Sequence, residues 1–176
     1  DTGVSLGDID NDGDLDLWVP QVKTYSFWDH SFLWENNGDG TFSDSTDASG
    51  LKVWSNTGGT WVDYDNDGDL DLAIAGHSSS YLISKIYKNT NGNFEDINAG
   101  LTGVENSSIA WGDYDNDGDL DLAITGRLNA FDECVAKIYN NRNGTFQDID
   151  AGLYDVERCS LAWGDYDKDG DLDLVI

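Results

Sequence analysis

The sequence predicts an all-β fold assembled from a unit that repeats about every fifty residues. The first observation is the pattern Asp-x-Asp-x-Asp-Gly-Asp-Leu-Asp, whose four copies begin at Asp8, Asp63, Asp113 and Asp165. Successive copies start 55, 50 and 52 residues apart. The second observation is that each copy runs into a short apolar segment with a period of two, which is typical of a β-strand. A loop that recurs at a nearly fixed period indicates a repeat protein.

Each repeat contains four predicted strands, and the Asp-rich loop lies between the first and the second. The first strands are expected at residues 3–7, 59–62, 108–112 and 160–164. The second strands are expected at residues 15–19, 70–75, 120–125 and 172–176. The third strands are expected at residues 31–35, 85–88 and 137–140. A turn rich in Asn and Gly then leads to a short fourth strand centred on Phe42, Phe94 or Phe146.

Four antiparallel strands in a unit of this length are typical of a β-propeller blade. The 176 residues then form three complete blades and the first half of a fourth, in a single propeller segment. We place the repeats approximately at residues 1–49, 50–99, 100–151 and 152–176. Because such a segment leaves two sheet edges unpaired, we expect it to continue in a longer chain or to associate with a second copy.

Each Asp-rich loop has the composition of an oxygen cage for a hard cation. Carboxylates at loop positions 1, 3 and 5 converge if the backbone turns sharply, and glycine at position 6 permits that turn because it adopts positive φ at little cost. Position 7 offers its backbone carbonyl, and the aspartate at position 9 completes the shell. Oxygen donors without nearby Cys or His favour Ca²⁺ over zinc or copper. A cage with this number of carboxylates also suits Ca²⁺ better than Mg²⁺. The sequence therefore predicts about four calcium sites, one in each repeat.

Twenty aspartates are the candidate metal ligands, and those at position 7 would bind through the main chain. They are Asp8, Asp10, Asp12, Asp14, Asp16, Asp63, Asp65, Asp67, Asp69, Asp71, Asp113, Asp115, Asp117, Asp119, Asp121, Asp165, Asp167, Asp169, Asp171 and Asp173. An EF-hand starts with the same pattern but needs a glutamate at position 12 and flanking helices. Position 12 is β-branched in every copy, which excludes the EF-hand. Acidic turns also occur as solvated hairpin loops, but four copies in one register argue against that explanation.

The overall charge restricts the possible partners. The chain carries 35 acidic and 9 basic residues, for a formal net charge of −26, and twenty of the acidic residues lie in the four loops. Such acidity argues against nucleic acids and anionic membranes as partners. No apolar run is long enough to span a bilayer, so membrane insertion is not expected.

A family resemblance is carried by Trp111–Ile124, which reads Trp-Gly-Asp-Tyr-Asp-Asn-Asp-Gly-Asp-Leu-Asp-Leu-Ala-Ile. It is followed by Lys-Ile-Tyr-Asn-Asn at residues 137–141 and Asn-Gly-Thr-Phe at residues 143–146. The pattern resembles the FG-GAP/VCBS repeats, the calcium-bearing blades of integrin α-subunit propellers and of many secreted microbial proteins. The resemblance covers essentially the whole chain. It implies a propeller of about seven blades, with calcium loops between the first and second strands.

The resemblance does not imply one activity, because such propellers serve adhesion, sugar binding and enzyme scaffolds. We expect an extracellular module, secreted or on the cell surface, for adhesion, carbohydrate or protein binding, or surface assembly. Calcium would have a structural role, and weak sites fill where Ca²⁺ is abundant, outside the cell. The alternative is the scaffold of a secreted carbohydrate-active enzyme, such as a calcium-dependent polysaccharide lyase. A lyase needs a base beside its cation; we find no catalytic motif and favour the non-enzyme.

Candidate ligand-binding residues are expected at the end of the blades opposite the cages, in the loops between second and third strands. Aromatic side chains there could stack on a sugar or contact a protein, or they could pack these loops onto the propeller rim. The candidates are Tyr25, Trp28, His30, His77, Tyr81, Arg127 and Phe131.

Other conspicuous residues have structural explanations. Cys134 and Cys159 are expected on the face opposite the cages, where they could form a disulfide or remain free thiols. Asn106 and Asn143 have the form of glycosylation acceptors, although Asn143 lies in a turn that needs Asn-Gly for its geometry. The tryptophans two residues before three of the loops are expected to pack between adjacent blades; they are Trp61, Trp111 and Trp163.

Overall fold

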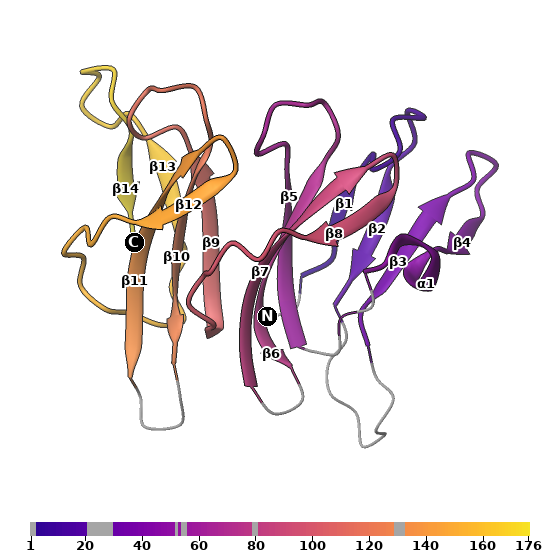
Figure 1. Ribbon diagram of the computed structural model, residues 1–176, viewed down its shortest axis with the longest axis horizontal. Helices are drawn as coiled ribbons and strands as arrows, with labels where there is room; N and C mark the ends of the chain where they lie inside the picture. The colour runs from indigo at the N-terminus through magenta and orange to yellow at the C-terminus, as the bar shows by residue number, and fades with distance from the viewer. Residues whose placement is uncertain (1–2, 21–29, 52, 54–55, 79–80, 129–132) are drawn as a thin grey trace.

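Four antiparallel β-sheets follow one another along the chain and stand side by side (Figure 1). The computed structural model describes residues 3–20, 30–51, 53, 56–78, 81–128 and 133–176. In the described part, three sheets have four strands and the last has two, each in simple chain order. This confirms the predicted all-β class, with three complete blades and half of a fourth. The array is propeller-like, and it does not close into a ring.

The strand bounds follow the predicted repeat. The first sheet contains β1 (Ser5–Gly7), β2 (Asp16–Val19), β3 (Phe32–Asn36) and β4 (Phe42–Asp44). The second contains β5 (Asn56–Val62), β6 (Asp71–Ser78), β7 (Tyr81–Thr90) and β8 (Asn93–Asp96). The third contains β9 (Glu105–Gly112), β10 (Asp121–Arg127), β11 (Cys134–Arg142) and β12 (Thr145–Asp148), and the last contains β13 (Ala162–Gly164) and β14 (Asp173–Val175). A single helical turn that the sequence analysis did not anticipate, α1 (Thr46–Ser49), follows β4.

The apolar core lies between neighbouring sheets. Along β6, every residue from Asp71 to Gly76 is buried, and the period of two sends successive side chains to opposite faces. Leu72 and Ile74 pack in a cluster shared with the first sheet, whereas Ala73 and Ala75 belong to a cluster shared with the third. The second blade is therefore held by the burial of both of its faces against its neighbours, as in other repeat proteins.

The first strands of successive sheets, β1, β5, β9 and β13, contact one another in a row. Close approach is possible because a tryptophan of one blade lies over a glycine of the preceding one. A Cβ atom at Gly7 would lie 2.9 Å from Trp61 Cδ1, and a Cβ atom at Gly112 would lie 2.8 Å from Trp163 Cγ. Trp111 packs on the cluster between the second and third blades. The expected role of these tryptophans in packing between blades is confirmed.

The turns between first and second strands all lie at one end of the sheets, at the top of Figure 1. The last residues of β6 and β10 and the first residues of β7 and β11 lie at the other end. Two alternatives were open for Cys134 and Cys159, and the structure shows no disulfide between them. Cys159 Sγ lies 3.0 Å from Thr125 Oγ1. Among the described residues, no helix has the length and apolar character needed to cross a membrane.

Candidate metal centres

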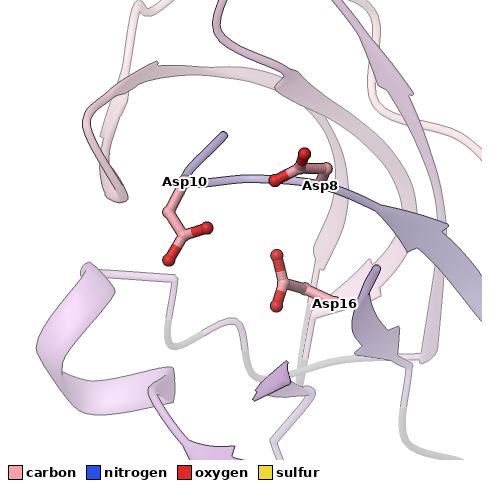
Figure 2. A group of neighbouring side chains, drawn as sticks. All are labelled: Asp8, Asp10 and Asp16. Carbon is pink, nitrogen blue, oxygen red and sulfur yellow. The ribbon is translucent and has the colours of Figure 1, made fainter. Parts of the chain in front are cut away.

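Each Asp-rich loop brings three carboxylates together, at positions 1, 3 and 9. In each group, one oxygen of every side chain lies within 4.8 Å of the others. Figure 2 shows the group in the first loop, where Asp8 and Asp10 come from the loop and Asp16 from the start of β2. The four groups are Asp8, Asp10 and Asp16; Asp63, Asp65 and Asp71; Asp113, Asp115 and Asp121; and Asp165, Asp167 and Asp173.

The position 1 carboxylate closes the loop on itself. Asp63 accepts hydrogen bonds from the backbone N–H groups of Asp67 and Gly68, both at 3.1 Å. The same pair of bonds recurs in the other three loops. Gly68 has φ of +93°, a conformation that side chains rarely adopt, which explains the glycine at position 6. The loop shape is therefore specified within nine residues of sequence.

The position 9 carboxylate lies beneath the loop, at the first residue of the second strand. Asp71 is fully buried and accepts backbone hydrogen bonds from Asn89 at 2.7 Å and Tyr64 at 3.2 Å. Burial outweighs these bonds and raises the pKa of Asp71 to about 7. The same causes raise the pKa of Asp121 to about 6. A buried carboxylate of this kind is stabilised in its charged form by a nearby cation.

The aspartates at positions 5 and 7 lie outside these groups of three and hold the turn. The position 5 carboxylate of Asp67 accepts the N–H of Asp69 at 3.0 Å, and this bond recurs in all four loops. The Asp69 side chain accepts the N–H of Asn91 at 3.1 Å and the side-chain amide of Asn11, from the preceding loop, at 2.8 Å. The position 7 side chains of Asp69, Asp119 and Asp171 thus have structural partners, which leaves their carbonyls as the groups to consider for a metal.

An asparagine near the end of each third strand joins a loop to its blade, and it was not among the residues predicted from the sequence. The N–H of Asn141 donates to Asp121 Oδ1 at 2.8 Å, and its side-chain amide donates to the carbonyls of Leu120 at 3.0 Å and Tyr64 at 3.1 Å. Tyr64 belongs to the loop of the preceding blade. Asn89 makes the equivalent bond to the carbonyl of Ile9 at 2.7 Å. We call Asn36, Asn89 and Asn141 the clasp asparagines; their recurrence in every complete repeat was a signal that could have identified them.

A cationic side chain already contacts the carboxylates of the second loop. Lys88 Nζ contacts the Asp65 carboxylate and lies 2.9 Å from Asp67 Oδ2. The other oxygen of Asp65, Oδ1, is buried without a hydrogen-bond partner among the described residues. Buried carboxylate oxygens normally have a hydrogen-bond partner or a bound ion, so this oxygen is available to bind a cation. All grouped donors are hard oxygens, and the residues therefore fit a hard cation such as calcium.

The candidate ligand-binding residues come from three blades and lie at strand ends away from the loops. His77 is half-buried near the end of β6, and Tyr81 begins β7 with 64% of its surface exposed. His30 precedes β3, and its Nδ1 lies 2.8 Å from its neighbour's carbonyl. Arg127 ends β10 and donates two hydrogen bonds to Glu105. The remaining candidates, Tyr25, Trp28 and Phe131, lie outside the described residues.

Comparison with known proteins places the chain among repeat proteins. A family model described as an FG-GAP-like repeat matches residues 24–74 and 63–124. A solved structure of an Agrocybe aegerita lectin, described as specifically recognising non-reducing terminal N-acetylglucosamine, is similar with a TM-score of 0.49 and 23% identity. The match covers 81% of this chain and 36% of the lectin, so the chain spans about a third of that protein. Among curated proteins, no sequence matches.

Proposed function

This chain belongs to the FG-GAP-like repeat family, and from that premise we propose that it is a calcium-binding, propeller-like module that binds a carbohydrate or a protein outside the cell. The observation that carries the proposal is the recurrence of three convergent carboxylates in each of four loops. The donor set consists of hard oxygens, which is the preference of calcium. An extracellular setting follows from the same chemistry, because weak calcium sites fill where the ion is abundant.

The ligands we propose are the side chains at positions 1, 3, 5 and 9 and the carbonyl at position 7. When bound, calcium would supply positive charge to carboxylates that otherwise repel one another. In the second loop, the position 5 carboxylate of Asp67 lies close to the position 3 carboxylate of Asp65, because Lys88 contacts both. With free calcium at 10 to 100 times its dissociation constant, each site would stabilise the fold by about 1.4–2.7 kcal/mol.

Calorimetric titration and thermal melting of the metal-free protein test the calcium proposal. We expect about four ions per chain and a marked increase in melting temperature when calcium is added, reversed by a chelator. Magnesium at the same concentration serves as the control, because it loses its water shell reluctantly. An unchanged melting curve, together with no binding heat at millimolar calcium, would remove the basis of the proposal.

We place the ligand-binding surface at the end of the sheets opposite the loops, around His77 and Tyr81. An exposed aromatic ring is suited to stacking on a sugar or to anchoring a protein partner. A glycan array with the calcium-loaded protein tests this placement, with the Tyr81→Ala variant expected to lose most binding. The control is Tyr166→Ala, because Tyr166 is 80% exposed in the fourth loop, at the other end. Equal losses in the two variants would refute the placement.

A further inference from the structure

We propose that the calcium sites of the first three loops differ in affinity, and that the residue before each clasp asparagine sets the difference. These residues are Glu35, Lys88 and Asn140, which precede Asn36, Asn89 and Asn141. The inference rests on the proposed calcium binding and concerns side chains that the repeat motif does not include. One position carries a negative, a positive and a neutral side chain in three loops that otherwise share the same carboxylates.

Lys88 faces the second loop. Its ammonium group contacts Asp65 and lies 2.9 Å from Asp67, so it spans the carboxylates at positions 3 and 5. Two of the proposed calcium ligands are therefore already paired with a positive charge. A calcium ion must displace this ammonium group or bind beside it, and either outcome weakens the site. The second loop should consequently have the lowest affinity of the three.

Asn140 occupies the same position at the third loop. Its side-chain amide donates to Asp115 at 2.8 Å and to Asp121 at 3.3 Å, so it reaches positions 3 and 9 without adding a charge. Among the described residues, the Arg142 guanidinium contacts Asn140, not the aspartates: its Nε donates to Asn140 Oδ1 at 2.9 Å. A neutral amide can rotate to present its oxygen, whereas an ammonium group has only donors. The third loop should therefore bind calcium more tightly than the second.

Glu35 occupies the position at the first loop. It lines a cavity together with Asp10, the position 3 carboxylate, and it accepts a hydrogen bond from Ser45 Oγ at 2.7 Å. A fourth carboxylate beside the group increases the attraction for a divalent ion. We expect the first loop to bind calcium at least as tightly as the third.

The test exchanges the residues of the second and third loops. Lys88→Asn gives the second loop the side chain of the third, and Asn140→Lys makes the reverse change. The matched control is Lys85→Asn, which removes a lysine from the same strand. Lys85 is 36% exposed and Lys88 is 35% exposed, but Lys85 pairs with Asp96, at 2.7 Å, instead of with a loop carboxylate. The control therefore separates a local effect from the change in net charge.

In NMR titrations, one backbone amide reports on the second loop and another reports on the third. Gly68 and Gly118 donate to the position 1 carboxylates of the second and third loops at 3.1 Å, so each signal should shift when its own loop binds calcium. In the unmodified protein, Gly118 should respond at lower calcium than Gly68. Lys88→Asn should lower the midpoint for Gly68 by roughly tenfold, because a full charge is removed beside a divalent ion. Asn140→Lys should raise the midpoint for Gly118, and Lys85→Asn should shift both signals slightly and equally.

Two failures can be distinguished. If Lys88→Asn shifts the Gly68 midpoint no more than Lys85→Asn does, the inference is wrong and calcium binding itself still stands. If neither glycine of the unmodified protein responds to calcium, the proposed function fails instead. Because Lys88→Asn alone decides the first case, the result does not depend on whether Asn140→Lys folds.

Discussion

Asn141 donates its side-chain amide to the carbonyl of Tyr64 at 3.1 Å, across the boundary between the second and third blades. The same amide donates to Leu120 in its own blade, so one buried side chain connects two neighbouring loops. Asn66 adds a second link by donating from its loop to the carbonyl of Gly118 at 3.2 Å. The loops are therefore a connected row, and a change in one of them should be transmitted to the next.

Removal of the clasp should cost more where it joins two blades. Asn141→Ala leaves two carbonyls without their donor and should lower the free energy of unfolding by about 2–3 kcal/mol. Asn36→Ala is the matched control, because the side chain of Asn36 is hydrogen-bonded to Leu15 and Gly38, both in its own blade. We expect a loss of about 1 kcal/mol there. Urea denaturation in calcium measures both, and equal losses would contradict the role of Asn141 between blades.

The ligand assignment can be tested within one loop. Asp115→Ala removes a position 3 carboxylate from the third group and should reduce the bound calcium by one ion. Asp119→Ala removes the same charge from position 7, where the side chain accepts the N–H of Asn143 at 2.8 Å and the carbonyl is retained. It should keep the full number of ions, at some cost in affinity. Calcium counting by equilibrium dialysis decides the matter, and loss of an ion from both variants would disprove the division of roles.

A Cβ atom is tolerated at only one of two equivalent glycines. At Gly112, it would lie 2.8 Å from Trp163 and 3.1 Å from Leu172, so the last sheet must move. Gly112→Ala should therefore reduce stability by about 1–3 kcal/mol and change the tryptophan fluorescence. Gly164→Ala is the control, because nothing among the described residues lies within 4 Å of its Cβ position. Similar melting temperatures for the two variants would show that the contact between Gly112 and Trp163 does not exclude a Cβ atom.

The metal-free protein should be more stable in mild acid than at neutral pH. Asp71 has its pKa raised from 3.8 to about 7 by burial, so the folded state binds a proton that the unfolded state has released. This stabilising contribution is fully present below the unfolded-state pKa of 3.8. It is lost as the pH rises through the folded-state pKa of about 7. Asp121 adds a smaller step near pH 6. Calcium should reverse the trend, since it binds the charged carboxylates.

Melting temperatures from pH 5 to 8, in chelator, measure this dependence. Asp71→Asn should flatten the profile, because the side chain buried at position 9 then no longer titrates. A profile that rises with pH in the metal-free protein would contradict the prediction.

The amino-acid sequence by itself determined the repeat, the strand pattern and the closed, carboxylate-rich loops. These features are local: the bonds from Asp67 and Gly68 that close a loop on Asp63 span only four and five residues. The apolar run after each loop specifies a strand without reference to the rest of the chain. That is why the predicted strands overlap the observed ones. The sequence predicted that positions 1, 3 and 5 converge and that position 9 completes the shell, whereas the structure groups positions 1, 3 and 9 and places position 5 outside the group.

Only the tertiary structure decided how the loops differ and how they are joined. Asn141 and Tyr64 are separated by 77 positions, and they meet because one blade packs against the next. Lys88 reaches Asp65 across 23 positions, through the pairing of the second and third strands. No local pattern contains these separations, because they depend on the packing distance between sheets and the register between strands. The loops share one motif, and their surroundings make them unequal.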